Sequence, residues 1–262
     1  MTDPRPRPDA PSTGLPPRLT RLTFHGPLSG ARADRMVGRL AGTAPRTVLD
    51  IGCGWGELML RVLAAVPGAT GTGLDLNADD LARGRRGAER RGLADRVAFL
   101  EESAQDTSRG PADLVLCVGS SQALGPVEPP RHLPRALASL RRLVGDGGRV
   151  LLGEGFWQRT PTAAELSGMW PGARADDHPD LATLLDLAVA AGFRPEWTET
   201  ASPDEWEEFE SAYRADAEAW LAGHGDHPLA AETRERLDRH RARWMSYRGV
   251  LGLAYLTLVP VR

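Results

Sequence analysis

The stretch VLDIGCGWGE, residues 48–57, decides the fold, because an apolar strand pattern breaks there into three glycines at alternate positions. Glycine has no Cβ, so such a turn lets backbone N–H groups and the start of the next helix approach a ligand closely. The dinucleotide fingerprint G-x-G-x-x-G requires a glycine where this chain has Glu57. The pattern is instead G-x-G-x-G, from Gly52 to Gly56, with Asp50 two residues ahead. The turn therefore departs from the dinucleotide pattern.

Short apolar runs alternate with helical patterns around this turn. Helix-type spacing of apolar residues appears near 30–42, 56–66, 78–91 and 131–144, and strand-type runs appear at 46–51, 69–75, 96–100, 113–118, 148–154, 193–200 and 250–259. Strands that alternate with helices are typical of right-handed crossover connections. We therefore predict an α/β fold with a doubly wound parallel sheet.

The last two predicted strands are separated by two long charged helical patterns, 203–221 and 228–247. Four aromatic residues of the first pattern recur at spacings of 3, 4 and 7, which places them on one helix face: Trp206, Phe209, Tyr213 and Trp220. Such a stripe is most often core packing, and the alternative is the wall of a substrate pocket. Trp244 and Tyr247, at the end of the second pattern, have the same two interpretations.

The composition excludes several classes of chemistry. The sequence contains no lysine, which excludes a pyridoxal Schiff base, a lysine general base and the lysine of a phosphate-binding Walker loop. The net charge of −3 indicates no general attraction to nucleic acid or to an anionic membrane surface. The two cysteines, Cys53 and Cys117, form neither a disulfide framework nor a zinc motif. A small-molecule or protein substrate is therefore favoured over nucleic acid or a membrane.

The chain has no apolar run approaching the roughly 18 residues of a membrane span, and its first 17 residues contain six prolines. We expect residues 1–17 to be a disordered tail, since they offer little apolar surface to bury. The predicted protein is soluble and cytoplasmic, without a membrane or nucleic-acid partner, and a monomer or homodimer.

A second acid, Asp75, follows 25 residues after Asp50 at the end of the next predicted strand, where a carboxylate can accept hydrogen bonds from ribose hydroxyls. Together, VLDIGCGWGE and GTGLDLN (residues 71–77) resemble the class I S-adenosylmethionine-dependent methyltransferases. The runs HGPLS and GEGFWQRTP, within residues 25–29 and 153–161, are similar to a bacterial branch of stand-alone members.

The resemblance implies a Rossmann-like, seven-stranded sheet whose last strand is antiparallel. It also implies a helical insertion between strands six and seven. Residues 18–262 would form one methyltransferase domain, with an N-terminal cap at 18–42 and an insertion or lid at 203–248.

The resemblance also implies the roles of the cofactor-binding residues. Asp50 would lie near the cofactor's ammonium group, and the glycine turn would lie against its methionyl and ribose parts. Asp75 would bind the ribose diol. Ser103 and Ala104 stand where family members often carry Asp-Ala before the adenine, so Glu102 or Gln105 is an alternative contact. The predicted cofactor residues are Asp50, Gly52, Cys53, Gly54, Gly56, Asp75, Leu76, Ser103, Ala104, Val118 and Gly119.

Two residues are candidates for the methyl-transfer step. His25 precedes the first predicted helix and is either a base or substrate contact, or a loop histidine bonded to backbone. Glu154 ends the fifth predicted strand, where it points toward the pocket or else caps a helix or forms an ion pair. His224 and His227 lie in a Gly/Pro-flanked loop without neighbouring ligands, so no metal is predicted.

The predicted function is in-line transfer of a methyl group to a small molecule at O, N, S or C. In-line displacement at a sulfonium depends mainly on orientation, and a general base is optional. The alternatives are a non-catalytic regulator that binds the same cofactor and an NAD(P)-dependent oxidoreductase, which position 57 disfavours. The loop GSSQALG, residues 119–125, lacks the Asn/Asp-Pro-Pro-Tyr pattern of protein and nucleic-acid methylation.

Overall fold

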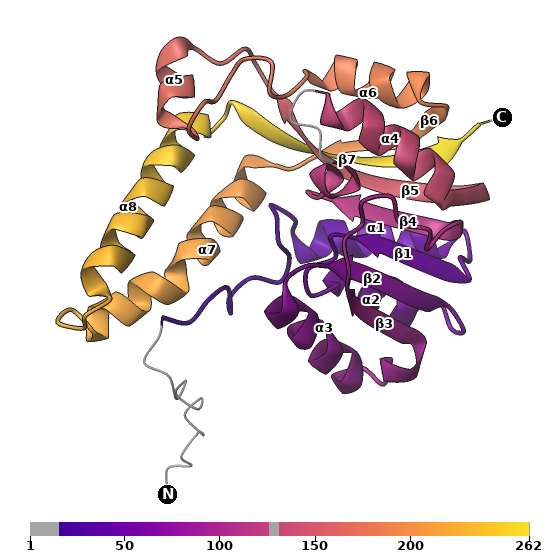
Figure 1. The fold of residues 1–262 in the computed structure, drawn as a ribbon, viewed down its shortest axis with the longest axis horizontal. Helices are drawn as coiled ribbons and strands as arrows, with labels where there is room; N and C mark the ends of the chain where they lie inside the picture. Colours follow the sequence, from indigo (N-terminus) through magenta and orange to yellow (C-terminus); the bar gives the residue numbers. More distant parts are fainter. Residues whose placement is uncertain (1–15, 126–130, 262) are drawn as a thin grey trace, which may run out of the picture.

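The computed structural model describes residues 16–125 and 131–261. Residues 1–15 of the predicted tail lie outside this range, so its predicted disorder stays a prediction. Seven strands form one sheet in the order β3-β2-β1-β4-β5-β7-β6 (Figure 1). Their bounds are β1 Thr47–Ile51, β2 Thr70–Asp75, β3 Val97–Glu101, β4 Ala112–Val118, β5 Val144–Trp157, β6 Phe193–Thr200 and β7 Leu251–Pro260.

Only β7 runs against its neighbours. It pairs antiparallel with β5 and β6, whereas β1, β2, β3, β4 and β5 are parallel to one another. The predicted Rossmann-like, seven-stranded sheet with an antiparallel last strand is therefore confirmed. Because the parallel strands share one direction, their carboxyl ends meet at one edge, where ligands bind in open α/β sheets.

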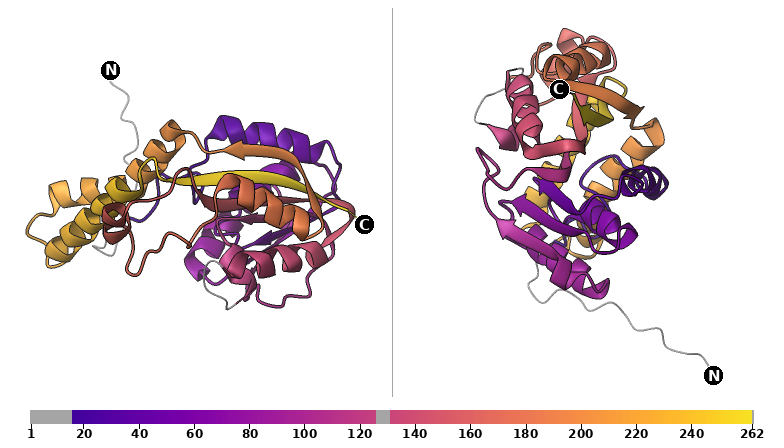
Figure 2. Two further views of the ribbon diagram at one scale, coloured as in Figure 1. Left: turned by 90° about the horizontal axis from the view of Figure 1, so that it is seen from above. Right: turned by 90° about the vertical axis from the view of Figure 1, so that its right-hand side faces the viewer.

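Helices cover both faces of the sheet (Figure 2). On one face lie α1 (Gly30–Ala41), α2 (Glu57–Ala65) and α3 (Ala78–Arg90), which bury residues such as Met36 and Leu60 against it. On the other face lie α4 (His132–Leu143) and α6 (Leu181–Ala190), which bury Leu137 and Leu184. The sheet thus separates two apolar cores, as in other doubly wound folds.

The predicted insertion between the last two strands is a pair of helices, α7 (Pro203–Gly223) and α8 (Ala230–Tyr247), which projects from the sheet beside α5 (Ala163–Gly168) (Figure 1). A capping box of Ser202 and Glu205 starts α7. The buried Glu210 of α7 accepts hydrogen bonds from Tyr247 Oη at 2.6 Å and pairs with His240 Nε2 at 2.7 Å. These contacts hold the two helices together.

The element boundaries differ from the sequence prediction mainly around β5. This strand spans residues 144–157, whereas the apolar run indicates only 148–154, because both of its ends continue by pairing: Val144 with Ala112, and Trp157 with Leu251. Two helices, α5 and α6, were not predicted. The α6 sequence LATLLDLAVA is apolar almost all round, so no 3.6-residue alternation marks it. Its start is marked by Asp180, which accepts a hydrogen bond from Thr183 N.

Candidate active site

Two adjoining cavities lie at the carboxyl edge of the sheet. The larger, about 380 Å³, extends from the β2 end to the β4 end, and the smaller, about 70 Å³, lies between the glycine turn and residues 24–28. Both are lined by His25, Gly52 and Val118. Between them they are lined by these predicted cofactor residues: Asp50, Gly52, Cys53, Gly54, Asp75, Leu76, Ser103, Ala104, Val118 and Gly119.

The glycine turn adopts left-handed backbone conformations that only glycine takes up freely. Gly52 has φ +60° and Gly54 has φ +54°. A Cβ on Gly52 would collide with the side chain of Ser120, and one on Gly54 would lie 3.2 Å from His25. The turn is therefore closed to side chains and leaves its backbone facing the cavities.

Gly56 has a different role. It lines neither cavity, and a Cβ there would lie 2.6 Å from the Phe99 ring. Gly56 has φ +63° and is the N-cap of α2. Its place in the motif therefore reflects the packing of the turn on β3.

The carboxylate of Asp75 organises the turn. Oδ2 accepts a hydrogen bond from Gly54 N at 2.7 Å, and Oδ1 accepts one from Asn77 N at 2.9 Å. Each carboxylate oxygen has a second lone pair, so both remain able to accept a further hydrogen bond from a ligand. Asp75 therefore couples the shape of the turn to the cavity that it lines.

Asp50 is a buried acid at the end of β1. Asp50 is 6% exposed. Burial, and to a smaller extent the charge of Asp75, raise the pKa of its carboxyl to about 8. Burial also raises the pKa of the neighbouring Cys53 thiol, so Cys53 is no thiolate nucleophile. A cationic group in the smaller cavity would relieve the cost of ionising Asp50.

Residues 19–25 cover the glycine turn. Trp55 Nε1 donates to Thr23 O at 2.8 Å, and the Arg83 guanidinium stacks over the Trp55 ring at 3.7 Å. Arg83 also donates to the carbonyl oxygens of Leu19 and Leu22. The sequence prediction missed Trp55 and Arg83, although the tryptophan stands inside the glycine motif.

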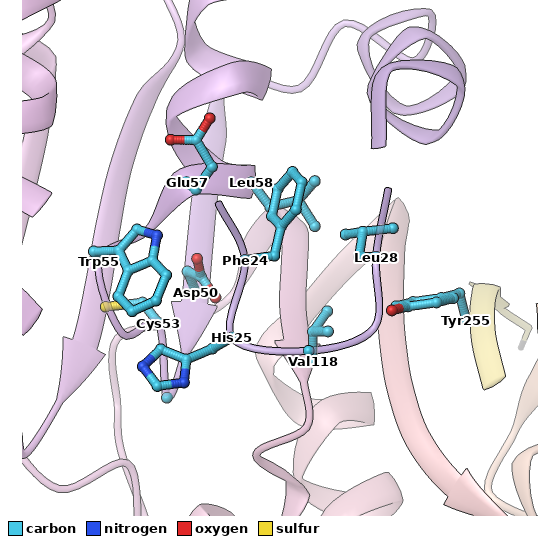
Figure 3. Close-up of a pocket in the computed structure, with 12 residues that line it drawn as sticks. Phe24, His25, Leu28, Asp50, Cys53, Trp55, Glu57, Leu58, Val118 and Tyr255 are labelled. Atoms are coloured by element: carbon cyan, nitrogen blue, oxygen red, sulfur yellow. The ribbon is translucent and has the colours of Figure 1, made fainter. Parts of the chain in front are cut away.

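His25 belongs to this cover. Figure 3 shows the side chains of His25 and Trp55 next to each other beside Asp50, and their rings are 4.2 Å apart. His25 Nε2 lies 3.4 Å from Asp80 Oδ2. Burial lowers the pKa of His25, and the Asp80 carboxylate raises it by a smaller amount. His25 therefore walls the cavity as a largely neutral imidazole at neutral pH.

Known proteins are similar to this chain in sequence and in fold. A sequence model of the methyltransferase domain matches residues 49–150. The uncharacterized protein YjhP of Escherichia coli is 29% identical over 226 residues, which cover 86% of this chain and 88% of YjhP. An S-adenosylmethionine-dependent methyltransferase from Thiobacillus denitrificans, crystallised with S-adenosyl-L-homocysteine, has a TM-score of 0.78 at 27% identity, covering 91% of this chain and 94% of that one. A Geobacter sulfurreducens methyltransferase with the same ligand has a TM-score of 0.78 at 28% identity, covering 93% and 98%.

The matched methyltransferase domain and the two structures that hold S-adenosyl-L-homocysteine support a class I S-adenosylmethionine-dependent methyltransferase. The predicted family, the methyltransferase class of enzyme and the methyl donor of that class are therefore confirmed. The acceptor is not identified by these similarities.

Residues after β3, where the adenine contact is predicted, form one side of the larger cavity. Ser103 and Ala104 line the larger cavity together with Glu102. Ser103 Oγ accepts a hydrogen bond from Gln105 N at 3.2 Å, and Glu102 pairs with Arg109 at 2.6 Å. Glu102 is thus engaged by an arginine, which leaves the Ser103 hydroxyl proton available to a ligand.

Glu154, the second candidate for the methyl-transfer step, lines neither cavity. It lies on β5 one residue beyond Gly153, whose carbonyl oxygen accepts a hydrogen bond from Gly119 N at 2.9 Å. The Glu154 residue is 7% exposed, and its Oε1 lies 3.9 Å from His132 Nε2. Glu154 is therefore a buried acid next to the two adjoining cavities at the carboxyl edge of the sheet, which together form the cofactor groove. Its catalytic role stays a prediction.

The histidines of the α7–α8 loop have a packing role. The His224 ring stacks on Trp220 at 4.7 Å, and its Nδ1 lies 2.8 Å from Trp220 O. Within residues 16–125 and 131–261, no cluster of His, Cys, Asp and Glu has an arrangement that could hold a metal ion. None of the helices that these same residues form combines the length and apolar character needed to cross a bilayer.

Proposed function

We propose that this chain binds S-adenosylmethionine along the carboxyl edge of β1, β2 and β4 and transfers its methyl group to a small-molecule acceptor. The observation that carries the proposal is the pair of carboxylates, Asp50 and Asp75, on the two sides of a glycine turn that has no room for side chains. A buried acid suits an ammonium group, and an acid with free lone pairs suits a ribose diol.

The residues fit the parts of the cofactor. Asp50 would hold the ammonium group, the Gly52–Gly54 backbone would contact the methionyl part, and Asp75 would bind the ribose hydroxyls. Ser103 and Ala104 would contact the adenine, with Leu76, which is 71% exposed, lying over it. The bound sulfonium supplies an activated methyl group with a neutral leaving group.

The chain's own contribution to the reaction is orientation and exclusion of water. Trp55 and Arg83 hold residues 19–25 over the groove, which fixes His25 beside it. Val118 and Gly119 line the groove where β4 ends. Orientation of this kind contributes several kcal/mol to a displacement reaction. His25 and Glu154 are our candidates for contact with the acceptor.

A third cavity, of small-molecule size, shares no described lining residue with the two that adjoin the glycine turn. It measures about 330 Å³ and lies where the ends of β6 and β7 meet the helix pair, with Trp206, Trp244 and Tyr247 among its lining residues. Sites for small molecules have volumes of about 300 Å³ and more, with mostly aromatic and apolar walls. The aromatic face of α7 thus serves partly as a cavity wall.

The proposal is tested by calorimetric titration of the purified protein with S-adenosylmethionine. Asp75→Ala should weaken binding by roughly 1.5–3 kcal/mol, the scale of charge-assisted hydrogen bonds, which is about 10- to 150-fold in Kd. Asp113→Ala is the matched control: Asp113 also accepts hydrogen bonds from two backbone N–H groups, those of Arg46 and Thr47, but at the opposite edge of the sheet.

The control should lower stability and leave cofactor affinity unchanged. Equal affinity of wild type and Asp75→Ala would refute the assignment of the ribose carboxylate. Binding of NADH in place of S-adenosylmethionine would refute the proposal as a whole. Tight cofactor binding with no S-adenosylhomocysteine formed from any acceptor would instead favour a non-catalytic regulator.

A further inference from the structure

Three polar side chains at the ends of β5, α4 and the segment before α6 are packed together without satisfying one another. The atoms Glu154 Oε2, His132 Nδ1 and His178 Nδ1 are buried and have no hydrogen-bond partner in the described part of the chain. A buried polar atom without a partner costs about 1–3 kcal/mol, and such atoms are rare in folded proteins. Three in one cluster therefore call for a functional explanation.

Glu154 has His132 and His178 as neighbours. His132 Nε2 lies 3.9 Å from Glu154 Oε1, close enough for charge attraction but too far for a hydrogen bond. His178 lies against β5 at Gly155, where a Cβ would come within 2.8 Å of its ring. Gly155 therefore leaves the space that lets His178 approach the strand beside Glu154.

His178 is held rigidly in this position. Its ring makes T-shaped contacts with the rings of Trp157 and Trp170, at centroid distances of 5.0 Å and 5.9 Å. Trp157 Nε1 donates a hydrogen bond to Ala175 O. Trp170 Nε1 donates to Asp177, the residue next to His178. The cluster is thus built by three separate chain segments that converge on one carboxylate.

The cluster borders the cofactor groove. Gly153, the residue before Glu154, is hydrogen-bonded to Gly119, which lines the groove. Burial raises the pKa of the Cys117 thiol, and the charges of Glu154 and Asp50 raise it further. Glu154 and Asp50 therefore lie close enough to influence the same β4 side chain from the two sides of that strand.

The titratable groups near Glu154 lie on β4, on α4 and in the segment before α6. His132 belongs to α4, His178 and Asp177 belong to the segment before α6, and β7 contributes the apolar Ala254. Burial lowers the pKa of His178, which the charges of Glu154 and Asp177 partly oppose. In residues 16–125 and 131–261, His132 is the basic side chain found within 4.0 Å of Glu154. Among the described arginines, none forms an ion pair with this carboxylate.

We propose that the acceptor is a protic nucleophile, a hydroxyl or a protonated amine, and that Glu154 takes up its proton, with His132 and His178 as positioning residues. The inference rests on the proposed methyl transfer. The acceptor's O–H or N–H bond breaks, and its proton goes to Glu154 Oε2, directly or through one water. The electron pair of that bond forms the new bond to the methyl carbon, and the sulfur keeps the pair of the S–CH₃ bond.

The geometry favours this role over the two simpler ones. A stabilising ion pair would place His132 within hydrogen-bond distance of Glu154, and the observed 3.9 Å does not. A metal site is not formed by the described residues. A thiolate or another soft acceptor needs no base, so it gives no reason to bury beside the groove a carboxylate whose Oε2 has no partner among the described residues, while its Oε1 accepts a hydrogen bond from Gly155 N at 3.2 Å.

The first test needs neither acceptor nor cofactor. The imidazole resonances of His132 and His178 are followed by NMR as a function of pH in wild type, in Glu154→Gln and in the control Glu196→Gln, which removes a carboxylate of β6 that pairs with Arg149. Loss of the Glu154 charge should lower the pKa of His178, because that charge raises it in the wild type, and the control should leave it unchanged. A His178 titration curve that does not respond to Glu154→Gln would overturn the proposal.

The second test measures turnover with three probe acceptors: catechol for a hydroxyl, benzylamine for an amine and thiophenol for a thiol. S-adenosylhomocysteine formation is followed from pH 5 to 9. We expect turnover of catechol or benzylamine, and a loss of about 100-fold or more in kcat for Glu154→Gln with unchanged S-adenosylmethionine affinity. Gly155→Ala, which displaces His178, should shift the midpoint of the pH profile while keeping most of the activity.

Different results would refute the protic acceptor and the binding of S-adenosylmethionine. Turnover of thiophenol alone, or a Glu154→Gln variant with the wild-type rate and pH profile, would overturn the protic acceptor and leave cofactor binding intact. Failure of wild type to bind S-adenosylmethionine in the calorimeter would instead refute the proposed function.

Discussion

Binding of S-adenosylmethionine is expected to release a proton from Asp50. Burial and the charge of Asp75 raise the pKa of the Asp50 carboxyl to about 8 in the free protein. At pH 7, one unit below this value, about nine-tenths of the molecules carry the proton. An ammonium group placed beside the carboxyl favours its charged form and lowers its pKa. Binding should therefore release about 0.9 proton at pH 7 and about 0.5 at pH 8.

The measurement is calorimetric titration at pH 7 in two buffers with different ionisation enthalpies, such as phosphate and Tris. The difference between the apparent enthalpies gives the number of protons released. Asp50→Asn should reduce this number to near zero. Glu57→Gln is the matched control, because Glu57 lines the same cavity but pairs with Arg61 and Arg91. Equal enthalpies in the two buffers for wild type, or an unchanged release in Asp50→Asn, would refute the placement of the ammonium group.

Three further predictions concern stability. Gly56→Ala should lower the free energy of unfolding, measured in urea, by about 1–3 kcal/mol more than Gly68→Ala does. Both glycines have positive φ, but only a Cβ on Gly56 would collide with an aromatic ring. Equal losses in the two variants would contradict this. Burial raises the pKa of Glu205, but bonds from Arg32, Ser202 and Ser29 outweigh it and lower the pKa to about 2. The contribution of ionised Glu205 to the free energy of unfolding should be complete above its unfolded pKa of about 4.3 and disappear as the pH falls toward 2. In denaturation curves, Glu205→Gln should flatten this dependence of the free energy of unfolding on pH. Glu210→Ala should speed hydrogen exchange in α8, because Tyr247 and His240 lose their shared acceptor.

The positions of several strands follow from features that a single sequence displays. The strands β1, β2 and β4 are short apolar runs that end at a glycine or an acid before a helical pattern, so they were predicted to within about two residues. The ends of β5 depend on partners far away in the chain, and α6 is nearly uniformly apolar. Topology supplies the missing signal for α6: β5 and β6 are parallel, and parallel strands require a crossover connection, usually a helix.

The predicted cofactor residues could be identified from the sequence because they are local. The residues from Asp50 to Gly56 are contiguous, and Asp75 follows at the end of the next strand, so one turn and one strand end supply most of the predicted residues that line the two cavities. Close approach of a ligand to the backbone of such a turn constrains the residue type to glycine. Trp55 and Arg83 escaped prediction because their joint role, holding residues 19–25, depends on two elements that only the fold brings together.

The acceptor half lacks this kind of local signal. His132 starts a helix, Glu154 lies inside an apolar strand and His178 lies in a loop with acidic neighbours, and each has an ordinary structural explanation in its own segment. Only the convergence of α4, β5 and the segment before α6 turns them into a group of unpaired buried atoms. A backbone turn that serves the same cofactor must keep its spacing, whereas side chains that serve a particular acceptor need only meet in space. The cost of leaving such groups unpaired is therefore a better guide to this half of the site than any sequence spacing.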